Sequence, residues 1–240
     1  MRTQLPDLQI AGRGNTLGEQ VHSRLRGAIL SGILKPGQKL SVRALASSLN
    51  VSLTPTRDAL ARLIAEDVLK QGSDRTVFVP VLDISEIDEV FNLRCLLEVK
   101  LAEQALANVS KSLAPALKRI QNKLVRSFDE HDYKGVVVHN FEFHFTLYEA
   151  ANAKITLKVV ENLWLRAGPM LNLLYPEFDR TRSGVLKHAA ILECVEKGEV
   201  SRIGMAIQAD ILGAKAELIR VVSETADEIF AHAYRITATV

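Results

Sequence analysis

Apolar residues recur at helical spacing in two short, neighbouring stretches near the N-terminal end of the chain. The segment 42–63 has the sequence VRALASSLNVSLTPTRDALARL. Between the two stretches, Asn50 tolerates a left-handed backbone and Ser52 is a favourable N-cap residue. Two short helices joined by so tight a turn predict a helix-turn-helix. The apolar positions are Leu45, Ala46 and Leu49 for the first helix, and Ala59, Leu60, Leu63 and Ile64 for the second.

The flanking segments extend this motif. The pattern predicts a preceding helix from about Leu17 to Ser31 and a short extended piece after the Pro36-Gly37 turn. After the motif, Val68 and Leu69, the loop QGSDR and then TVFVPV predict two short strands joined by a tight loop. A strand, loop and strand beside a helix-turn-helix form a wing, with Arg75 near its tip.

From residue 83 onward, Gly and Pro become sparse and the apolar pattern is helical. We expect a mainly α protein with a winged helix-turn-helix over residues 16–80 and an all-helical bundle of about six to seven helices over 83–230. Residues 1–15 and 231–240 are expected to be tails. Pro169 is expected to kink one helix. The helices are predicted at about 85–107, 113–129, 133–150, 155–174, 180–196 and 200–227.

The charge is unevenly divided along the chain. Residues 1–80 carry 11 Lys and Arg against 6 Asp and Glu, whereas the remaining 160 carry 19 against 22. A basic N-terminal part suits a reader of double-stranded DNA, because neutralising phosphates supplies most non-specific affinity. The second helix should expose Thr54, Thr56 and Arg57, with Arg62 a further candidate, and these side chains suit phosphates and guanine edges.

Other function classes find little support in the composition. Cys95 and Cys194 are far apart and form no CxxC pair, which argues against a disulfide framework and a cysteine zinc site. The N-terminus lacks the apolar core of a secretion signal, and no segment approaches the length of a membrane span. We therefore expect a cytoplasmic protein with no membrane partner.

The combination LKPGQKLSVRALASSLNVSLTPTRDALARL, a wing, and then a helical domain opening with EVFNLRCLLEVKLAEQA resembles the GntR superfamily of bacterial transcription regulators. The C-terminal half resembles the branch with an FCD effector domain. The resemblance implies a homodimer that binds a palindromic operator and contacts DNA through Arg43, Ser52, Thr54 and Arg57, with Arg75 on the wing. The chain departs from the family pattern at Leu53, where arginine is usual, and at Thr76, where the wing commonly has glycine.

Spacing alone also brings ligand-type side chains together. Asn140 and His144 are four residues apart and share a helix face. Gly198 lies almost midway between His188 and Asp210, so a helical hairpin turning there would place these two at the same height. Four such side chains could converge inside the bundle. A histidine in a helical bundle can equally be an ordinary hydrogen-bonded core residue.

The resemblance gives these positions a role. FCD domains often bind a divalent metal with one aspartate and three histidines, and here Asn140 stands at the usual aspartate and Asp210 at the last histidine. This oxygen-richer set leaves Zn, Ni or Mn possible. The resemblance also implies that Arg94 faces the effector cavity. The alternative is a plain Arg94–Glu98 ion pair on the helix surface.

These observations predict a ligand-responsive transcription regulator rather than an enzyme. Its effector would be a small molecule, most simply a carboxylate, bound in the helical domain, which would also carry the dimer interface. Two alternatives remain from the sequence: an architectural DNA-binding protein without an effector, and a metal-dependent hydrolase. No clear general base accompanies the histidines, which weighs against the hydrolase.

Overall fold

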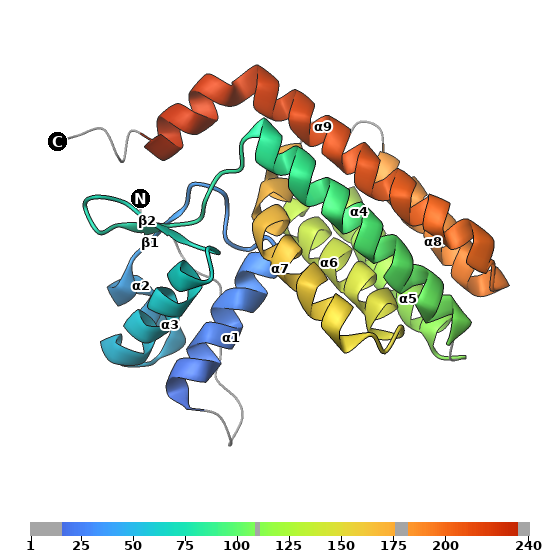
Figure 1. The fold of residues 1–240 in the computed structure, drawn as a ribbon, viewed down its shortest axis with the longest axis horizontal. Coiled ribbons are helices and arrows are strands. Elements are labelled where there is room, and N and C mark those ends of the chain that lie inside the picture. Colours follow the sequence, from blue (N-terminus) through green and yellow to red (C-terminus); the bar gives the residue numbers. More distant parts are fainter. Residues whose placement is uncertain (1–15, 109–110, 176–181, 235–240) are drawn as a thin grey trace. The chain divides into compact units, whose positions relative to one another are not determined.

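The computed structural model describes residues 16–108, 111–175 and 182–234, with the backbone alone from residue 226 onward. The chain divides into two compact units. One contains Met1–Ile29, Leu34–Val81 and Asp227–Val240, and the other contains Leu30–Ile33 and Leu82–Ala226. Most of the described chain is helical (Figure 1), as the sequence predicted. The expected tail 1–15, most of the expected tail 231–240 and the expected helix start at Arg180 lie outside the described residues.

The first unit is a winged helix-turn-helix. Three helices enclose an apolar core that includes Leu25, Leu45 and Leu63, each fully buried. A three-stranded antiparallel sheet in the order β1-β3-β2 completes the unit. Its elements are α1 (Leu17–Leu30), β1 (Lys39–Leu40), α2 (Val42–Leu49), α3 (Leu53–Ala65), β2 (Lys70–Gln71) and β3 (Val77–Phe78).

The first wing strand lies two residues later than the sequence predicted. The expected strand residues Val68 and Leu69 are buried instead, and both of their backbone N–H groups donate to the carbonyl of Leu63. These bonds satisfy a carbonyl at the end of α3 that has no partner within the helix. The strand pairing therefore starts at Lys70, opposite Phe78.

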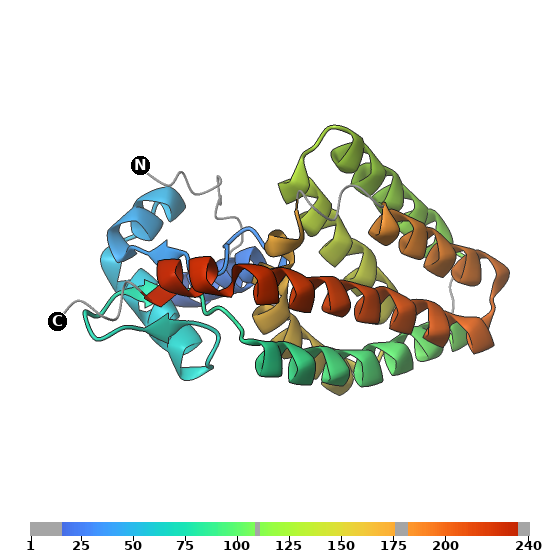
Figure 2. The ribbon, with the colours of Figure 1, turned by 90° about the horizontal axis from the view of Figure 1, so that it is seen from above.

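The second unit is a bundle of six α-helices and one 3-10 helix within the described residues. Its helices are long and lie side by side, which the two views in Figures 1 and 2 show for α4 and α9. Lys215 of α9 bridges to Asp88 and Asn92 of α4. The elements are α4 (Ile84–Ala107), α5 (Leu113–Asp129), α6 (Tyr133–Glu149), α7 (Lys154–Met170), η1 (Leu171–Leu174), α8 (Ser183–Lys197) and α9 (Val200–Tyr234), of which the part from Asp227 onward belongs to the first unit.

Local signals fix where these helices begin and turn. Asp83 and Glu86 form a reciprocal capping box at the start of α4. Between α8 and α9, Gly198 adopts φ 65°, a left-handed C-cap that lets the chain reverse direction. The resulting α8–α9 hairpin carries His188 and Asp210 on adjacent helices.

The sequence predicted a helix that continues to Leu174 with a kink at Pro169. The structure differs from this prediction. Pro169 lies in the last turn of α7, which ends at Met170 and passes into η1. The Asn172 side chain donates to the carbonyl of Pro169 at 2.9 Å and to the carbonyl of Gly32 at 2.8 Å. The side-chain amide thus ties the end of α7 to the turn after α1.

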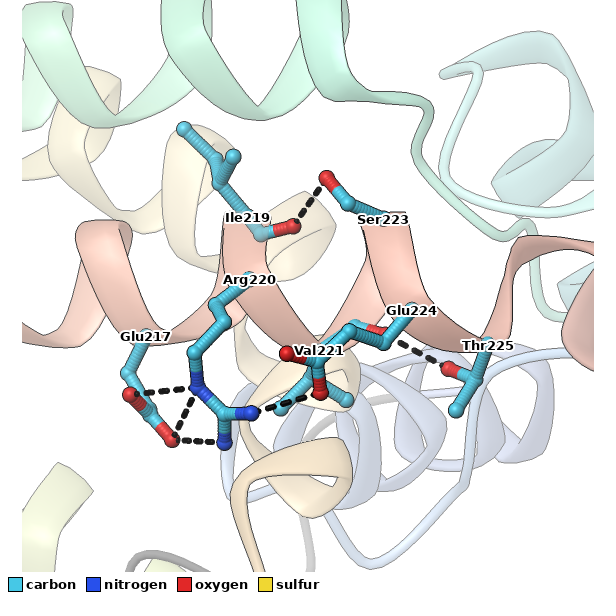
Figure 3. Close-up of polar contacts among 7 residues, drawn as sticks. All are labelled: Glu217, Ile219, Arg220, Val221, Ser223, Glu224 and Thr225. Carbon is cyan, nitrogen blue, oxygen red and sulfur yellow. Dashed lines mark hydrogen bonds and ion pairs between the residues drawn. The ribbon is translucent and has the colours of Figure 1, made fainter.

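The last helix, α9, extends to Tyr234, beyond the expected end near residue 227. Thr225 leaves helical geometry, with φ −120° and ψ 15°. At Thr225, and at Ser223 two residues before it, the side-chain hydroxyl donates to the carbonyl four residues back (Figure 3), a pattern that bends helices. On the exposed side, Arg220 bridges Glu217 and Glu224.

Candidate functional site

The turn between α2 and α3 has the geometry that the sequence predicted for a helix-turn-helix. Asn50 adopts φ 53° and ψ 46°, the left-handed conformation that a short polar side chain tolerates. The backbone N–H of Val51 then donates to the carbonyl of Ala46 and closes the turn. Ser41 caps the start of α2. The exposed face of α3 is thereby held at a fixed angle to α2.

Four of the expected DNA-contacting residues lie on exposed positions of this motif, namely Arg43, Ser52, Thr54 and Arg57. Ser52 occupies the N-cap position, but its side chain makes no capping hydrogen bond, so the hydroxyl can contact another group. The expectation that Thr56 is exposed was wrong. Thr56 is fully buried and its hydroxyl donates to the carbonyl of Ser52 at 3.1 Å. Thr56 shares the inner stripe of α3 with Ala59, Leu60 and Leu63.

Arg75 is exposed in the loop between β2 and β3, with φ 62°. The neighbouring Asp74 carboxylate accepts hydrogen bonds from the backbone N–H and the hydroxyl of Thr76, at 2.9 and 2.7 Å. These bonds lower the pKa of Asp74. Thr76 stands where the family commonly has glycine, so in this chain a side-chain hydrogen bond shapes the wing loop that presents Arg75.

In the helical unit, His144, His188 and Asp210 converge from α6, α8 and α9. One possible ligand atom from each lies within 4.8 Å of the other two. His144 Nε2 is 3.2 Å from Asp210 Oδ2. The His188 ring is stacked on Phe143, and its buried Nδ1 has no hydrogen-bond partner among the described residues. A buried nitrogen without a partner points to a ligand that the protein itself does not supply.

The ionisation of these groups suits a metal ion. Burial lowers the pKa of His188 to about 3, against the opposing effect of the Asp210 carboxylate. Burial alone would raise the pKa of Asp210, but hydrogen bonding to His144 and the charges of the two histidines bring it to about 2. At neutral pH the cluster therefore offers a neutral imidazole and a carboxylate, the forms that bind metals. These residues fit a divalent cation.

Asn140 lies one turn before His144 on α6 and is half-buried. It lines a cavity with His144 and Asp210, and an adjoining pocket with His188. The four residues singled out by spacing therefore border two adjoining hollows, with Asn140 common to both. Asn140 is placed to contribute an amide oxygen to a ligand in either.

Arg94 is not on the helix surface. It is 3% exposed, and its Nε donates to Glu98 Oε1 at 2.7 Å. The ion pair expected as the alternative does form, but inside the bundle, and Arg94 also lines the cavity. Its guanidinium lies 4.1 Å from the ring centre of Trp164. The one hydrogen bond that the described residues give this guanidinium uses Nε, which leaves the Nη donors for a ligand.

The cavity has about 520 Å³ of space not filled by protein atoms, part of which is open to solvent. Polar and apolar side chains share its wall, and the charged, amide and imidazole groups come from α4, α6 and α9. The remaining lining residues include Val137, Trp164, Leu171, Leu174, Tyr175 and Ile211.

Two residues important for this site were missed by sequence reasoning. The Tyr148 hydroxyl lies 3.0 Å from His144 Nδ1 and donates to Glu98 Oε2 at 2.7 Å. Trp164 donates to Glu98 Oε1 at 2.9 Å. Tyr148 follows His144 by four residues on α6, so helical spacing could have drawn attention to it. Nothing local to Trp164 indicates its role.

A winged helix-turn-helix joined to a helical unit that contains a cavity is the architecture of a two-domain transcription regulator. The residues 17–79 match the model of the gntR family of bacterial regulatory proteins, and residues 89–212 match the FCD domain. The chain belongs to the GntR family, in its FCD-containing branch. No helix within the described ranges is long and apolar enough to cross a membrane.

Similar proteins are transcription regulators rather than enzymes. The chain is 31% identical over 156 residues to the HTH-type transcriptional regulator McbR of Escherichia coli K12, covering 65% of this chain and 71% of that protein. It is 28% identical to the gluconate operon transcriptional repressor of Bacillus licheniformis, covering 61% and 60%. The solved structure of E. coli McbR/YncC superposes with a TM-score of 0.79 at 25% identity, covering 86% of this chain and 99% of that one.

Proposed function

We propose that the protein is a cytoplasmic regulator that binds a palindromic operator as a homodimer and responds to a small carboxylate held beside a divalent metal ion. The observation that carries this proposal is the placement of Arg94, Asn140, His144 and Asp210 around one buried cavity. Arg43, Ser52, Thr54, Arg57 and Arg75 are the proposed DNA contacts. Zn²⁺, Ni²⁺ and Mn²⁺ are all compatible with the donor set of Asn140, His144, His188 and Asp210.

Formal charge links the metal to the carboxylate. Among the cavity-lining side chains and Glu98, the charges of Arg94 and Glu98 cancel, which leaves the negative charge of Asp210. A carboxylate would be repelled from such a site. A divalent cation on the His144, His188 and Asp210 cluster reverses the balance to one net positive charge. A bound monocarboxylate then neutralises this charge, and the Nη donors of Arg94 are free to bind its oxygens.

The metal would supply a positive charge and open coordination positions for the effector. The protein residues have the remaining roles: Arg94 orients the carboxylate, and the cavity wall excludes molecules that are too large. One relative is named for the gluconate operon. Gluconate is a small hydroxy-carboxylate, and we therefore include it among the test compounds.

The test combines Zn²⁺ titration with thermal unfolding of chelator-treated protein. We expect about one Zn²⁺ per chain, and stabilisation by gluconate or another small hydroxy acid only when Zn²⁺ is present. A ligand at 100 times its Kd adds about 2.7 kcal/mol, which raises Tm by several degrees. His188→Gln should lose Zn²⁺, whereas Arg94→Gln should keep Zn²⁺ and lose the response to the acid.

His139→Gln is the matched control, because His139 precedes Asn140 and bonds instead to Glu142. It should bind Zn²⁺ as the wild type does. Full Zn²⁺ content in His188→Gln would show that the metal site is misplaced. If neither Zn²⁺ nor any acid binds the wild type, the cavity has no sensing role and the architectural alternative gains support.

A further inference from the structure

Glu98 lies at the centre of a buried hydrogen-bond chain that joins the arginine to the histidines. Its Oε1 accepts from Arg94 Nε at 2.7 Å and from Trp164 Nε1 at 2.9 Å. Its Oε2 accepts from the Tyr148 hydroxyl at 2.7 Å. Glu98, Tyr148 and Trp164 are at most 1% exposed, so water does not compete for these bonds.

The direction of each bond in this chain follows from donor and acceptor chemistry. An ionised carboxylate only accepts, so the single proton of the Tyr148 hydroxyl points to Glu98. The Tyr148 oxygen must then accept from His144 Nδ1, 3.0 Å away. Nδ1 therefore carries a proton.

A proton fixed on Nδ1 decides what His144 Nε2 can do. In the neutral ring Nε2 is the atom with the free electron pair, and it points at Asp210 Oδ2, 3.2 Å away. A lone pair and a carboxylate oxygen repel each other unless a proton or a cation lies between them. The tautomer set by Glu98 through Tyr148 is thus the one that can bind a metal together with Asp210 and His188.

We infer that Tyr148 and Glu98 are positioning residues that hold His144 in its metal-binding tautomer and tie the metal site to the orientation of Arg94. This inference rests on the proposed metal and carboxylate site and adds how its two halves are connected. Outer hydrogen bonds of this kind typically change metal affinity 10- to 100-fold. The same carboxylate orients Arg94, so cation and effector would be held by one rigid polar unit.

The first test is Tyr148→Phe, which removes the hydroxyl and keeps the ring. Zn²⁺ affinity, measured by competition with a chelating dye, should fall by about 10- to 100-fold. Nitrogen-15 NMR of the metal-free protein supplies a readout that packing alone would not move. In the wild type His144 Nδ1 should be protonated, and in Tyr148→Phe this preference should be lost. A wild-type His144 with Nδ1 unprotonated and the proton on Nε2 would overturn the inference.

Tyr133→Phe is the matched control. The Tyr133 hydroxyl lies 3.2 Å from His131 Nδ1, a similar tyrosine and histidine contact that is not part of the buried chain. The Tyr133 ring, which the substitution keeps, stacks on Tyr175 of the cavity wall. Loss of the hydroxyl should leave Zn²⁺ affinity unchanged. Equal weakening in both variants would show that the effect is not specific to the buried chain.

The second test, Glu98→Gln, reverses the donor and acceptor directions of the Glu98–Tyr148–His144 hydrogen bonds with little change in side-chain shape. The amide oxygen should stay toward Arg94 and Trp164, and the amide NH₂ would then donate to Tyr148. Tyr148 must in turn donate to His144 Nδ1, which forces the proton onto Nε2 and blocks it as a ligand. We expect Zn²⁺ affinity to fall at least tenfold. Adding Tyr148→Phe should restore part of it, because no hydroxyl remains to impose the wrong tautomer.

The outcomes separate this inference from the proposed function. A wild type that binds no Zn²⁺ contradicts the metal site itself. If the wild type binds Zn²⁺ and both single variants bind it equally well, the metal site stands and the positioning role is refuted. A double variant weaker than either single variant would indicate a merely structural role. Circular dichroism confirms folding, and the NMR result on Tyr148→Phe decides the question if Glu98→Gln does not fold.

Discussion

His188 should make the stability of the helical unit depend on pH. In the metal-free protein its pKa lies near 3, because the ring is buried, whereas in the unfolded chain it titrates near 6.5. Below about pH 6.5 the unfolded state therefore binds one more proton than the folded state. The folded state loses roughly 1.4 kcal/mol per pH unit from this group as the pH falls.

We expect the free energy of unfolding of chelator-treated protein to fall by roughly 2 kcal/mol from this group between pH 7 and pH 5. Trp164 is the single tryptophan and is buried in the helical unit, so its fluorescence in urea follows that unit. The control is His188→Gln, which should lose this part of the pH dependence. The same dependence in both proteins would mean that His188 does not titrate as described.

At the residue scale, spacing predicted which side chains lie close together where the helical period sufficed. Asn140 and His144 lie one turn apart, and the hairpin at Gly198 brought His188 beside Asp210. Spacing could not decide whether Arg94 and Glu98 were inside or outside, because an i,i+4 pair has the same pattern on any face. Burial depends on packing against Trp164 of α7, which no local pattern near Arg94 encodes.

At the element scale, the turn after α1 is packed tightly against α6 and α7. Gly32 has φ 66°, and a Cβ there would lie 2.5 Å from Val137 Cγ1 and 3.1 Å from the carbonyl oxygen of Gly168. Gly198 has nearly the same φ, 65°, but a Cβ would meet nothing within 4 Å. Replacing either glycine by alanine therefore carries the same cost for a left-handed backbone, but only at Gly32 would the added Cβ clash with its neighbours.

Gly198→Ala should cost about 1 kcal/mol of stability, from the left-handed backbone alone. Gly32→Ala should cost roughly 2 to 4 kcal/mol, because overpacking against a stiff valine and a carbonyl adds to the backbone cost. Urea unfolding followed by Trp164 fluorescence measures both. An equal cost would show that the turn at Gly32 has room to move.

The elements themselves were largely predictable, and the departures have local causes. Val68 and Leu69 are residue types common in strands, but here their N–H groups bond to the carbonyl of Leu63 at the end of α3 and their side chains are buried in the core. The helix expected to continue to Leu174 ends at Met170, because a side-chain amide from Asn172 supports a tighter turn. Neither preference is visible without knowing which backbone groups would otherwise lack partners.

At the scale of the whole molecule, the uneven charge of the chain follows its two units. The basic N-terminal part carries the winged helix-turn-helix, and the helical unit carries the cavity. If the cavity controls DNA binding, ligand and DNA must be linked by a coupling free energy, which is typically 1–3 kcal/mol. The same coupling free energy is obtained whether the effector concentration or the DNA concentration is varied.

The most direct measurement is the affinity for a DNA duplex selected from a random library, by fluorescence anisotropy at fixed salt. We expect Zn²⁺ with the acid found by thermal unfolding to change Kd by about 5- to 150-fold. Arg57→Ala should weaken binding by about 1–3 kcal/mol whether or not the ligand is present, which marks the bound site as the α3 face. An unchanged Kd under conditions where Zn²⁺ and the acid are shown to be bound would contradict ligand control of DNA binding.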